Sequence, residues 1–191
     1  MRIGVLAAQG AFIEHIVMLR KVGVEARDVR LPQELAGLDG LIIPGGESTT
    51  ISKLMFDYNL AGEIRNMVKN GLPVFGTCAG MIVLASKTSE SKVEPLGLMR
   101  ITVGRNAFGR QVDSFETELS IPVLGKKPFP GVFIRAPIIE KADGEVEILA
   151  RLADGTGVAA RQGNILACAF HPELTDDLRF HEYFLNMAAK N

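Results

Sequence analysis

Short runs of continuously apolar residues, separated by segments of helical periodicity, dominate the first half of the chain. Such runs occupy residues 3–8, 40–43 and 72–76, and another short strand is predicted over residues 24–29. A strand that is apolar at every position must be covered on both faces, and strands separated by helices usually pair in parallel. The sequence therefore predicts a doubly wound α/β fold, with a mostly parallel central sheet and helices on both faces.

Helical spacing of apolar residues indicates which segments cover the sheet. Phe12, Ile16 and Leu19 recur at helical intervals after the first strand, and residues 59–70 show a second amphipathic pattern. Residues 79–85 are apolar on all sides, which is typical of a buried helix. A last helix closes the chain, and its expected apolar face consists of Phe180, Phe184, Met187 and Ala188.

The pattern changes in the second half, where residues 115–121 alternate between apolar and polar side chains. Such alternation predicts a half-exposed, antiparallel strand. We therefore expect a small antiparallel excursion between about residues 96 and 135. A chain of 191 residues without a linker or repeat is expected to form a single domain over residues 1–191. Further strands are predicted at residues 132–134, 146–152, 157–161 and 165–170.

Charge and cysteine content exclude several classes of partner and compartment. Lys and Arg number 21 and Asp and Glu number 22, so the chain lacks the long-range attraction that nucleic acid or anionic lipid requires. The two cysteines are too few for a disulfide framework and lack the spacing of a metal site. The apolar run at residues 3–8 is shorter than the core of a signal peptide. We expect a cytoplasmic protein with neither a nucleic-acid nor a membrane partner.

A cysteine stands between a predicted strand and a predicted helix, with glycines two positions before and two after it. The segment is residues 76–80, Gly-Thr-Cys-Ala-Gly, and its central residue is Cys78. Small flanking residues permit the sharp strand-to-helix turn of a nucleophile elbow, and a helix N-terminus favours the thiolate. The alternative interpretation is a buried thiol in a tight turn.

His171 is the histidine best placed to act as the base for this thiol. It follows the apolar run at residues 165–170, and ligands bind at the carboxyl ends of strands in open α/β folds. Pro172 favours an extended His171, and in extended chain the residues i and i+2 face the same way. Glu173 would then orient the imidazole as the third member of a triad. The alternative is a solvated His-Pro-Glu turn, but Cys78 at another strand end favours the triad.

The remaining histidines and the second cysteine are expected to play no part in the chemistry. His15 and His181 fall on amphipathic helices and are interpreted as surface residues. Cys168 lies within an apolar strand and is interpreted as a core thiol.

A glycine-containing loop follows the third predicted strand and can complete the site. It spans residues 44–50, Pro-Gly-Gly-Glu-Ser-Thr-Thr, and its glycines leave backbone N–H groups approachable. The N–H groups of Gly46 and Ala79 could together stabilise the oxyanion of an acyl-transfer reaction. The alternative is a phosphate-binding loop, but the glycine spacing fits neither common phosphate motif and no lysine follows.

These motifs together resemble the triad (class I) glutamine amidotransferases. More narrowly, the chain is similar to the family of glutaminase subunits of pyridoxal 5'-phosphate synthase, and the similarity runs from residue 3 to about residue 187. The narrower resemblance rests on residues 8–11 (Ala-Gln-Gly-Ala), Glu14 and His15, residues 104–111 (Gly-Arg-Asn-Ala-Phe-Gly-Arg-Gln), 114–117 (Ser-Phe-Glu-Thr) and 171–175 (His-Pro-Glu-Leu-Thr).

The resemblance implies a role for each matching position. Cys78 would be the nucleophile, His171 the base and acid, and Glu173 its orienting partner. The N–H groups of Gly46 and Ala79 would form the oxyanion hole. The reaction would convert L-glutamine to glutamate and ammonia without a metal or an organic cofactor. The implied glutamine contacts are Gly46, Glu47, Ser48, Arg105, Ile134 and Arg135.

The resemblance also implies a partner protein. Ammonia would pass to a (β/α)8-barrel subunit that makes pyridoxal 5'-phosphate, and residues 9–15 would lie near that subunit. The residues themselves leave other functions open: a glutaminase of the imidazole, purine or tryptophan pathways, another cysteine hydrolase on a similar sheet, or a binding module without activity.

Overall fold

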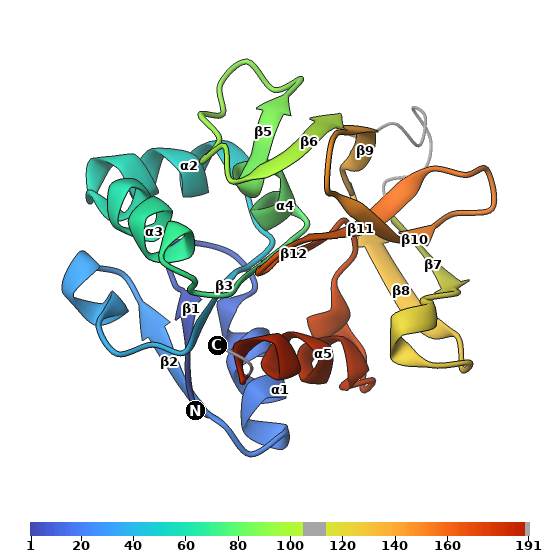
Figure 1. Cartoon of the computed structure of the whole chain (residues 1–191), viewed down its shortest axis with the longest axis horizontal. Helices are drawn as coiled ribbons and strands as arrows, with labels where there is room; N and C mark the ends of the chain where they lie inside the picture. Colours follow the sequence, from blue (N-terminus) through green and yellow to red (C-terminus); the bar gives the residue numbers. More distant parts are fainter. Residues whose placement is uncertain (105–113, 190–191) are drawn as a thin grey trace.

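The strands lie in one large sheet and one small sheet in the computed structural model, which describes residues 1–104 and 114–189. The small sheet pairs β7 (Ser114–Leu119) with β8 (Phe129–Ile134). The large sheet contains β1 (Arg2–Leu6), β2 (Glu25–Val29), β3 (Gly40–Ile43), β4 (Val74–Thr77), β5 (Ala85–Thr88), β6 (Met99–Gly104), β9 (Ile138–Ala142), β10 (Glu147–Arg151), β11 (Gly157–Gln162) and β12 (Ile165–Cys168). Its order among the described residues is β2-β1-β3-β4-β12-β11-β9-β6-β5, with β10 paired to β11 (Figure 1).

The parallel half of the large sheet carries the apolar runs that predicted it. β2, β1, β3, β4 and β12 pair in parallel, and all residues of β3, β4 and β12 are buried. Burial at successive positions means that the strands are covered on both faces, as their continuous apolar sequence requires. The predicted doubly wound α/β class is confirmed.

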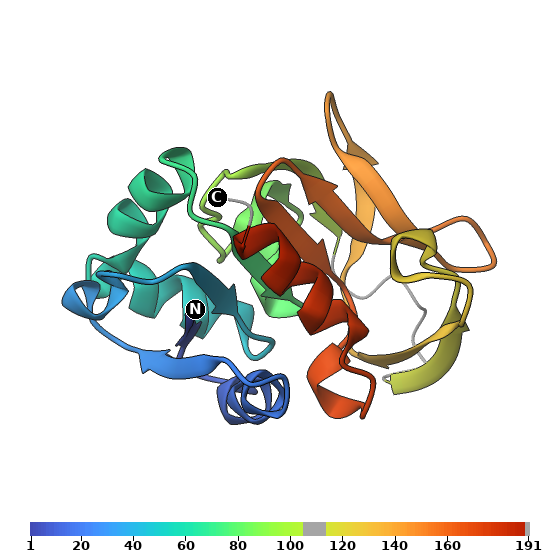
Figure 2. The ribbon, with the colours of Figure 1, turned by 60° about the horizontal axis from the view of Figure 1, so that its bottom comes forward.

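Helices cover both faces of this parallel half. They are α1 (Phe12–Lys21), α2 (Ser48–Asp57), α3 (Leu60–Lys69), α4 (Ala79–Leu84) and α5 (Arg179–Ala188), with short 3-10 turns at η1 (Pro32–Leu35), η2 (Pro122–Leu124) and η3 (Pro172–Leu174). α1 and α5 lie together on one side of the sheet, and α2 and α3 lie on the other (Figures 1 and 2). Phe75 of β4 contacts Phe180 and Phe184 of α5, which confirms the predicted apolar face of the last helix.

The antiparallel part is larger than the predicted excursion. β7 and β8 pair antiparallel as expected, but antiparallel pairing also joins β6 to β9 and β11 to β9, β10 and β12.

The predicted elements do not include α2, β5, β6 or β9. α2 begins with Ser-Thr-Thr, which is weak helix-forming sequence, and the Glu47 side chain compensates by accepting hydrogen bonds from the N–H groups of Thr49 and Thr50.

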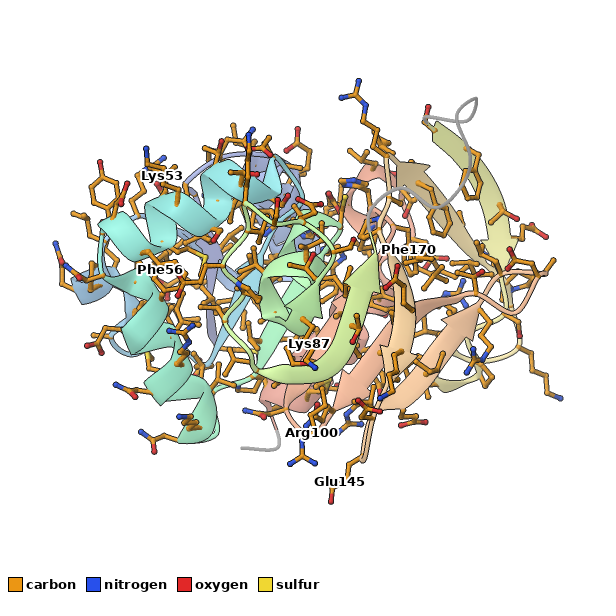
Figure 3. The ribbon with its side chains drawn as sticks, turned by 90° about the horizontal axis from the view of Figure 1, so that it is seen from above. Lys53, Phe56, Lys87, Arg100, Glu145 and Phe170 are labelled. Carbon is orange, nitrogen blue, oxygen red and sulfur yellow. The ribbon has the colours of Figure 1, made fainter. Side chains whose placement is uncertain are left out.

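The topology brings the ends of several parallel strands to one edge of the sheet. Cys78 follows β4, His171 follows β12, and residues 44–47 follow β3. Phe170, next to His171, lies in the interior of the molecule, whereas Lys53, Arg100 and Glu145 project from its periphery (Figure 3).

None of the helices in the described part of the chain has the length and apolar character needed to cross a membrane.

Candidate active site

The backbone at Cys78 turns sharply between β4 and α4. Its φ of 48° and ψ of −106° are strained for a residue with a side chain. A Cβ atom on Gly76 would lie 2.6 Å from the carbonyl of Gly80, and a Cβ on Gly80 would clash with the carbonyl oxygen of Ile43. The two glycines are therefore needed because β3, β4 and α4 approach too closely for side chains, which is the physical basis of the Gly-x-Cys-x-Gly spacing.

His171 and Glu173 are hydrogen-bonded within the turn that follows β12. The His171 Nδ1 and Glu173 Oε1 atoms are 2.7 Å apart, and both residues are buried. The backbone N–H of His171 donates to the carbonyl of Val132 at 2.8 Å, which fixes the turn against β8. The expected contact between residues i and i+2 is thus present.

Two neighbouring side chains govern the protonation of His171. Burial lowers its pKa, but hydrogen bonding to Cys78 and to Glu173 outweighs burial and raises the pKa to about 10. The pKa of Glu173 is held below its ordinary value, because His15 and the hydrogen bond from His171 outweigh the effect of burial. At neutral pH this arrangement favours an imidazolium that is hydrogen-bonded to Cys78 and to the Glu173 carboxylate.

Gly45 is packed between the side chains of Cys78 and His171. A Cβ atom at this position would clash with the Cε1 atom of the His171 ring and lie 3.2 Å from the Cβ of Cys78. Its backbone N–H donates to the Thr77 hydroxyl at 3.0 Å, and its carbonyl accepts from the N–H of Ala11 at 3.0 Å. The glycine loop is thereby held close to the thiol and the imidazole.

A cavity of about 700 Å³ opens in front of the thiol, which is a suitable volume for a small-molecule site. Its lining includes nearly all of the residues singled out from the sequence. Glu173 lies behind the His171 ring and does not line the cavity, and Arg105 lies outside the described residues. The lining residues are Gly46, Glu47, Ser48, Cys78, Ala79, Ile82, Glu90, Ile134, Arg135 and His171.

Two of the lining carboxylates differ in what they contact. The Glu47 side chain accepts from the backbone of Thr49 and Thr50, and hydrogen bonding, chiefly from the Thr50 hydroxyl, lowers its pKa. Glu90 is 9% exposed and accepts a hydrogen bond from the Ser48 hydroxyl at 2.7 Å. No recognised motif surrounds Glu90 in the sequence, so its place in the cavity was not predicted.

The interpretation of His15 and His181 as surface residues is wrong, since both are fully buried. α1 and α5 face each other on the same side of the sheet, and the two rings lie between them and Phe75. An amphipathic pattern does not reveal that two helices bury their polar positions against each other. The prediction for Cys168 is confirmed, because this thiol is fully buried and burial raises its pKa well above the ordinary value.

Comparison with known proteins provides independent information. The model of the SNO glutamine amidotransferase family matches residues 5–190. A protein of Dehalococcoides mccartyi named Pyridoxal 5'-phosphate synthase subunit PdxT is 60% identical over 190 residues, covering 98% of this chain and 97% of the relative. A protein of the same name from Herpetosiphon aurantiacus is also 60% identical, with 98% and 100% covered. A crystal structure titled glutamine amidotransferase aligns with a TM-score of 0.93 at 51% identity, covering 98% of both chains.

Proposed function

The chain belongs to the SNO glutamine amidotransferase family, and on this premise we propose how it acts as the glutaminase subunit of a pyridoxal 5'-phosphate synthase. The observation that carries the proposal is the geometry at one cavity, where Cys78 lies beside His171 and Glu173 orients the ring. We propose these three residues as the catalytic triad. A thiol, an imidazole and a carboxylate in this order are suited to acyl transfer.

The proposed reaction begins when the Cys78 thiolate attacks the side-chain amide carbon of L-glutamine. The N–H groups of Gly46 and Ala79 stabilise the oxyanion, and the His171 imidazolium donates its proton to the departing ammonia. This step leaves a thioester between Cys78 and the glutamyl group. His171, now neutral, activates water for attack on the thioester, and glutamate leaves with the thiolate restored.

We propose that other residues lining the cavity bind the carboxylate and the ammonium group of glutamine. A free amino acid presents a carboxylate, which cations and N–H groups bind, and an ammonium, which carboxylates bind. Glu90 lines the cavity together with Glu47, and its buried carboxylate is proposed as a further partner for the ammonium. The remaining proposed contacts are Gly46, Glu47, Ser48, Arg105, Ile134 and Arg135.

We further propose that residues 1–191 form one glutaminase domain that works in the cytoplasm and delivers ammonia to a (β/α)8-barrel synthase subunit. The apolar core supports the domain proposal, because it is continuous from Ile3 to Ala188. The two free cysteines fit a reducing compartment. The family and the printed names of the relatives support a synthase partner.

Ammonia release from glutamine, measured during titration with the barrel subunit, tests the proposed function. We expect weak hydrolysis by the chain alone and about tenfold activation at saturation. This activation requires only that the barrel subunit bind the active conformation about 1.4 kcal/mol more tightly than the inactive one. Synthase subunits of the imidazole, purine and tryptophan pathways are the matched controls. Activation by one of those in place of the barrel subunit would contradict the assignment of the partner.

Glu173→Gln is expected to lower kcat for glutamine by at least about 100-fold while changing KM little. The amide lacks the charge that helps to raise the pKa of His171, and it can favour the wrong ring tautomer. Steady-state kinetics separate the two constants. A large rise in KM with kcat preserved would mean that Glu173 binds substrate and does not orient the base.

A further inference from the structure

Two buried histidines lie behind the triad, on the side of Glu173 that faces away from His171. The Nε2 atom of His15 is 3.4 Å from Glu173 Oε2 and 3.1 Å from the Thr77 hydroxyl. Its other nitrogen, Nδ1, is 3.0 Å from Nε2 of His181. His15 and His181 are both fully buried, so water does not compete for these contacts. The reaction as described above uses neither ring.

The positions of the hydrogens on the two rings follow from what surrounds them. Burial is the largest influence on both rings and lowers their pKa values, that of His181 to about 3, so each ring carries one hydrogen at neutral pH. In one arrangement the Nε2–H of His181 donates to Nδ1 of His15, and the Nε2–H of His15 points toward Glu173 and Thr77. In the other arrangement both hydrogens sit on the Nδ1 atoms.

The surroundings distinguish these two arrangements. Nδ1 of His181 and Oε2 of Glu173 are buried and have no hydrogen-bond partner by strict geometry within the described part of the chain. Hydrogens on Nδ1 would bury an unsatisfied donor on His181, which is costly. They would also leave a bare His15 nitrogen facing the Glu173 carboxylate oxygen, and the Thr77 hydroxyl would then have to donate to that nitrogen. Hydrogens on the Nε2 atoms leave only the Nδ1 lone pair of His181 unsatisfied, and they direct the Nε2–H of His15 toward the Glu173 carboxylate.

We propose that His15 is a positioning residue for the triad, which donates from Nε2 to the second carboxylate oxygen of Glu173 and is held in that tautomer by His181. Glu173 is then fixed at both oxygens, at Oε1 by His171 and at Oε2 by His15. The contact of His15 with Thr77 extends this role, because the Thr77 hydroxyl also accepts from the N–H of Gly45 beside the reacting groups. The kinetic part of this inference rests on the proposed glutaminase function.

Imidazole nitrogen NMR of the full-length chain tests the proposed tautomers without any assay of activity. Long-range correlation spectra of the 15N-labelled protein distinguish N–H from bare ring nitrogens, and His15→Gln and His181→Gln variants assign the signals. We expect both rings to be neutral at pH 7, with hydrogen on Nε2 and a bare Nδ1. A bare Nε2 on His15 would overturn the proposal, whatever the protein's substrate.

Three substitutions at His15 test its effect on the reaction in the presence of the synthase subunit. His15→Leu removes the donor at similar volume and is expected to lower kcat on the order of 10-fold or more, with KM changed less than twofold. The amide of His15→Gln reaches the position of Nε2 and should restore most of kcat. The shorter amide of His15→Asn reaches only the position of Nδ1 and should not.

A matched core variant separates positioning from general loss of stability. Phe184→Leu lies on α5 against the same Phe75 ring that both histidines contact, but it alters no hydrogen bond of the triad. It should lower the unfolding temperature and leave kcat unchanged. If the wild type is active and the His15→Leu variant is equally active, the proposed role of His15 is wrong. If the wild type itself has no glutaminase activity, the proposed function is wrong.

Discussion

Cys78→Ala is expected to reduce glutamine hydrolysis by at least about 1000-fold while leaving the fold intact, because only the thiolate can form the thioester. Cys78 is 7% exposed and lines the cavity, so removal of its sulfur enlarges that open cavity and leaves no enclosed void. Ammonia release measures the loss, and circular dichroism with thermal unfolding checks the fold. Binding of the synthase subunit should be retained.

Cys168→Ser is the matched control for this experiment. Cys168 is the second free thiol, fully buried in β12, and its Sγ lies 3.3 Å from the carbonyl of Phe170 as a donor. A serine hydroxyl can make the same hydrogen bond, so we expect hydrolysis and sensitivity to thiol reagents to remain. Residual activity above about one hundredth in Cys78→Ala, or loss of thiol sensitivity in Cys168→Ser, would contradict the assignment of the nucleophile.

The parts of the site that could be predicted from the sequence are those specified by neighbours in the chain. His171 and Glu173 are two residues apart, and the intervening Pro172 restricts the backbone enough to predict their contact. Gly76 and Gly80 mark the sharp turn around Cys78, because side chains there would clash with backbone. The parallel strands were equally predictable, since a strand buried on both faces leaves an uninterrupted apolar run.

The parts that could not be predicted depend on contacts between distant segments. His15 and His181 are separated by 166 positions, and each looks like a polar residue on an amphipathic helix until α1 and α5 are placed side by side (Figure 1). Glu90 reaches the cavity from a segment without a motif, and only its contact with Ser48 reveals its place. In these cases tertiary contacts, and not local sequence, determine burial and partner.

Gly80→Ala is expected to destabilise the protein by more than about 3 kcal/mol, the largest stability effect that we predict for a single methyl group. A Cβ atom at Gly80 would clash with the backbone carbonyl oxygen of Ile43 and lie 3.4 Å from its Cβ. No side-chain rotation can relieve a clash with backbone. α4 would have to move away from β3, and this movement would also displace Cys78, so hydrolysis should fall together with the free energy of unfolding.

Gly62→Ala is the control because Gly62 also lies within a helix, α3. Apart from its own helix backbone and chain neighbours, no atom of the described residues lies within 4 Å of the position that a Cβ would occupy. Alanine there should stabilise the protein by up to about 1 kcal/mol, since it restricts the unfolded chain and favours the helix. Urea unfolding of both variants measures the two free-energy changes. If Gly80→Ala is as stable as Gly62→Ala, close approach of β3 and α4 is not the reason for glycine two positions after Cys78. The Gly-x-Cys-x-Gly spacing would then have to be explained by the reaction and not by the fold.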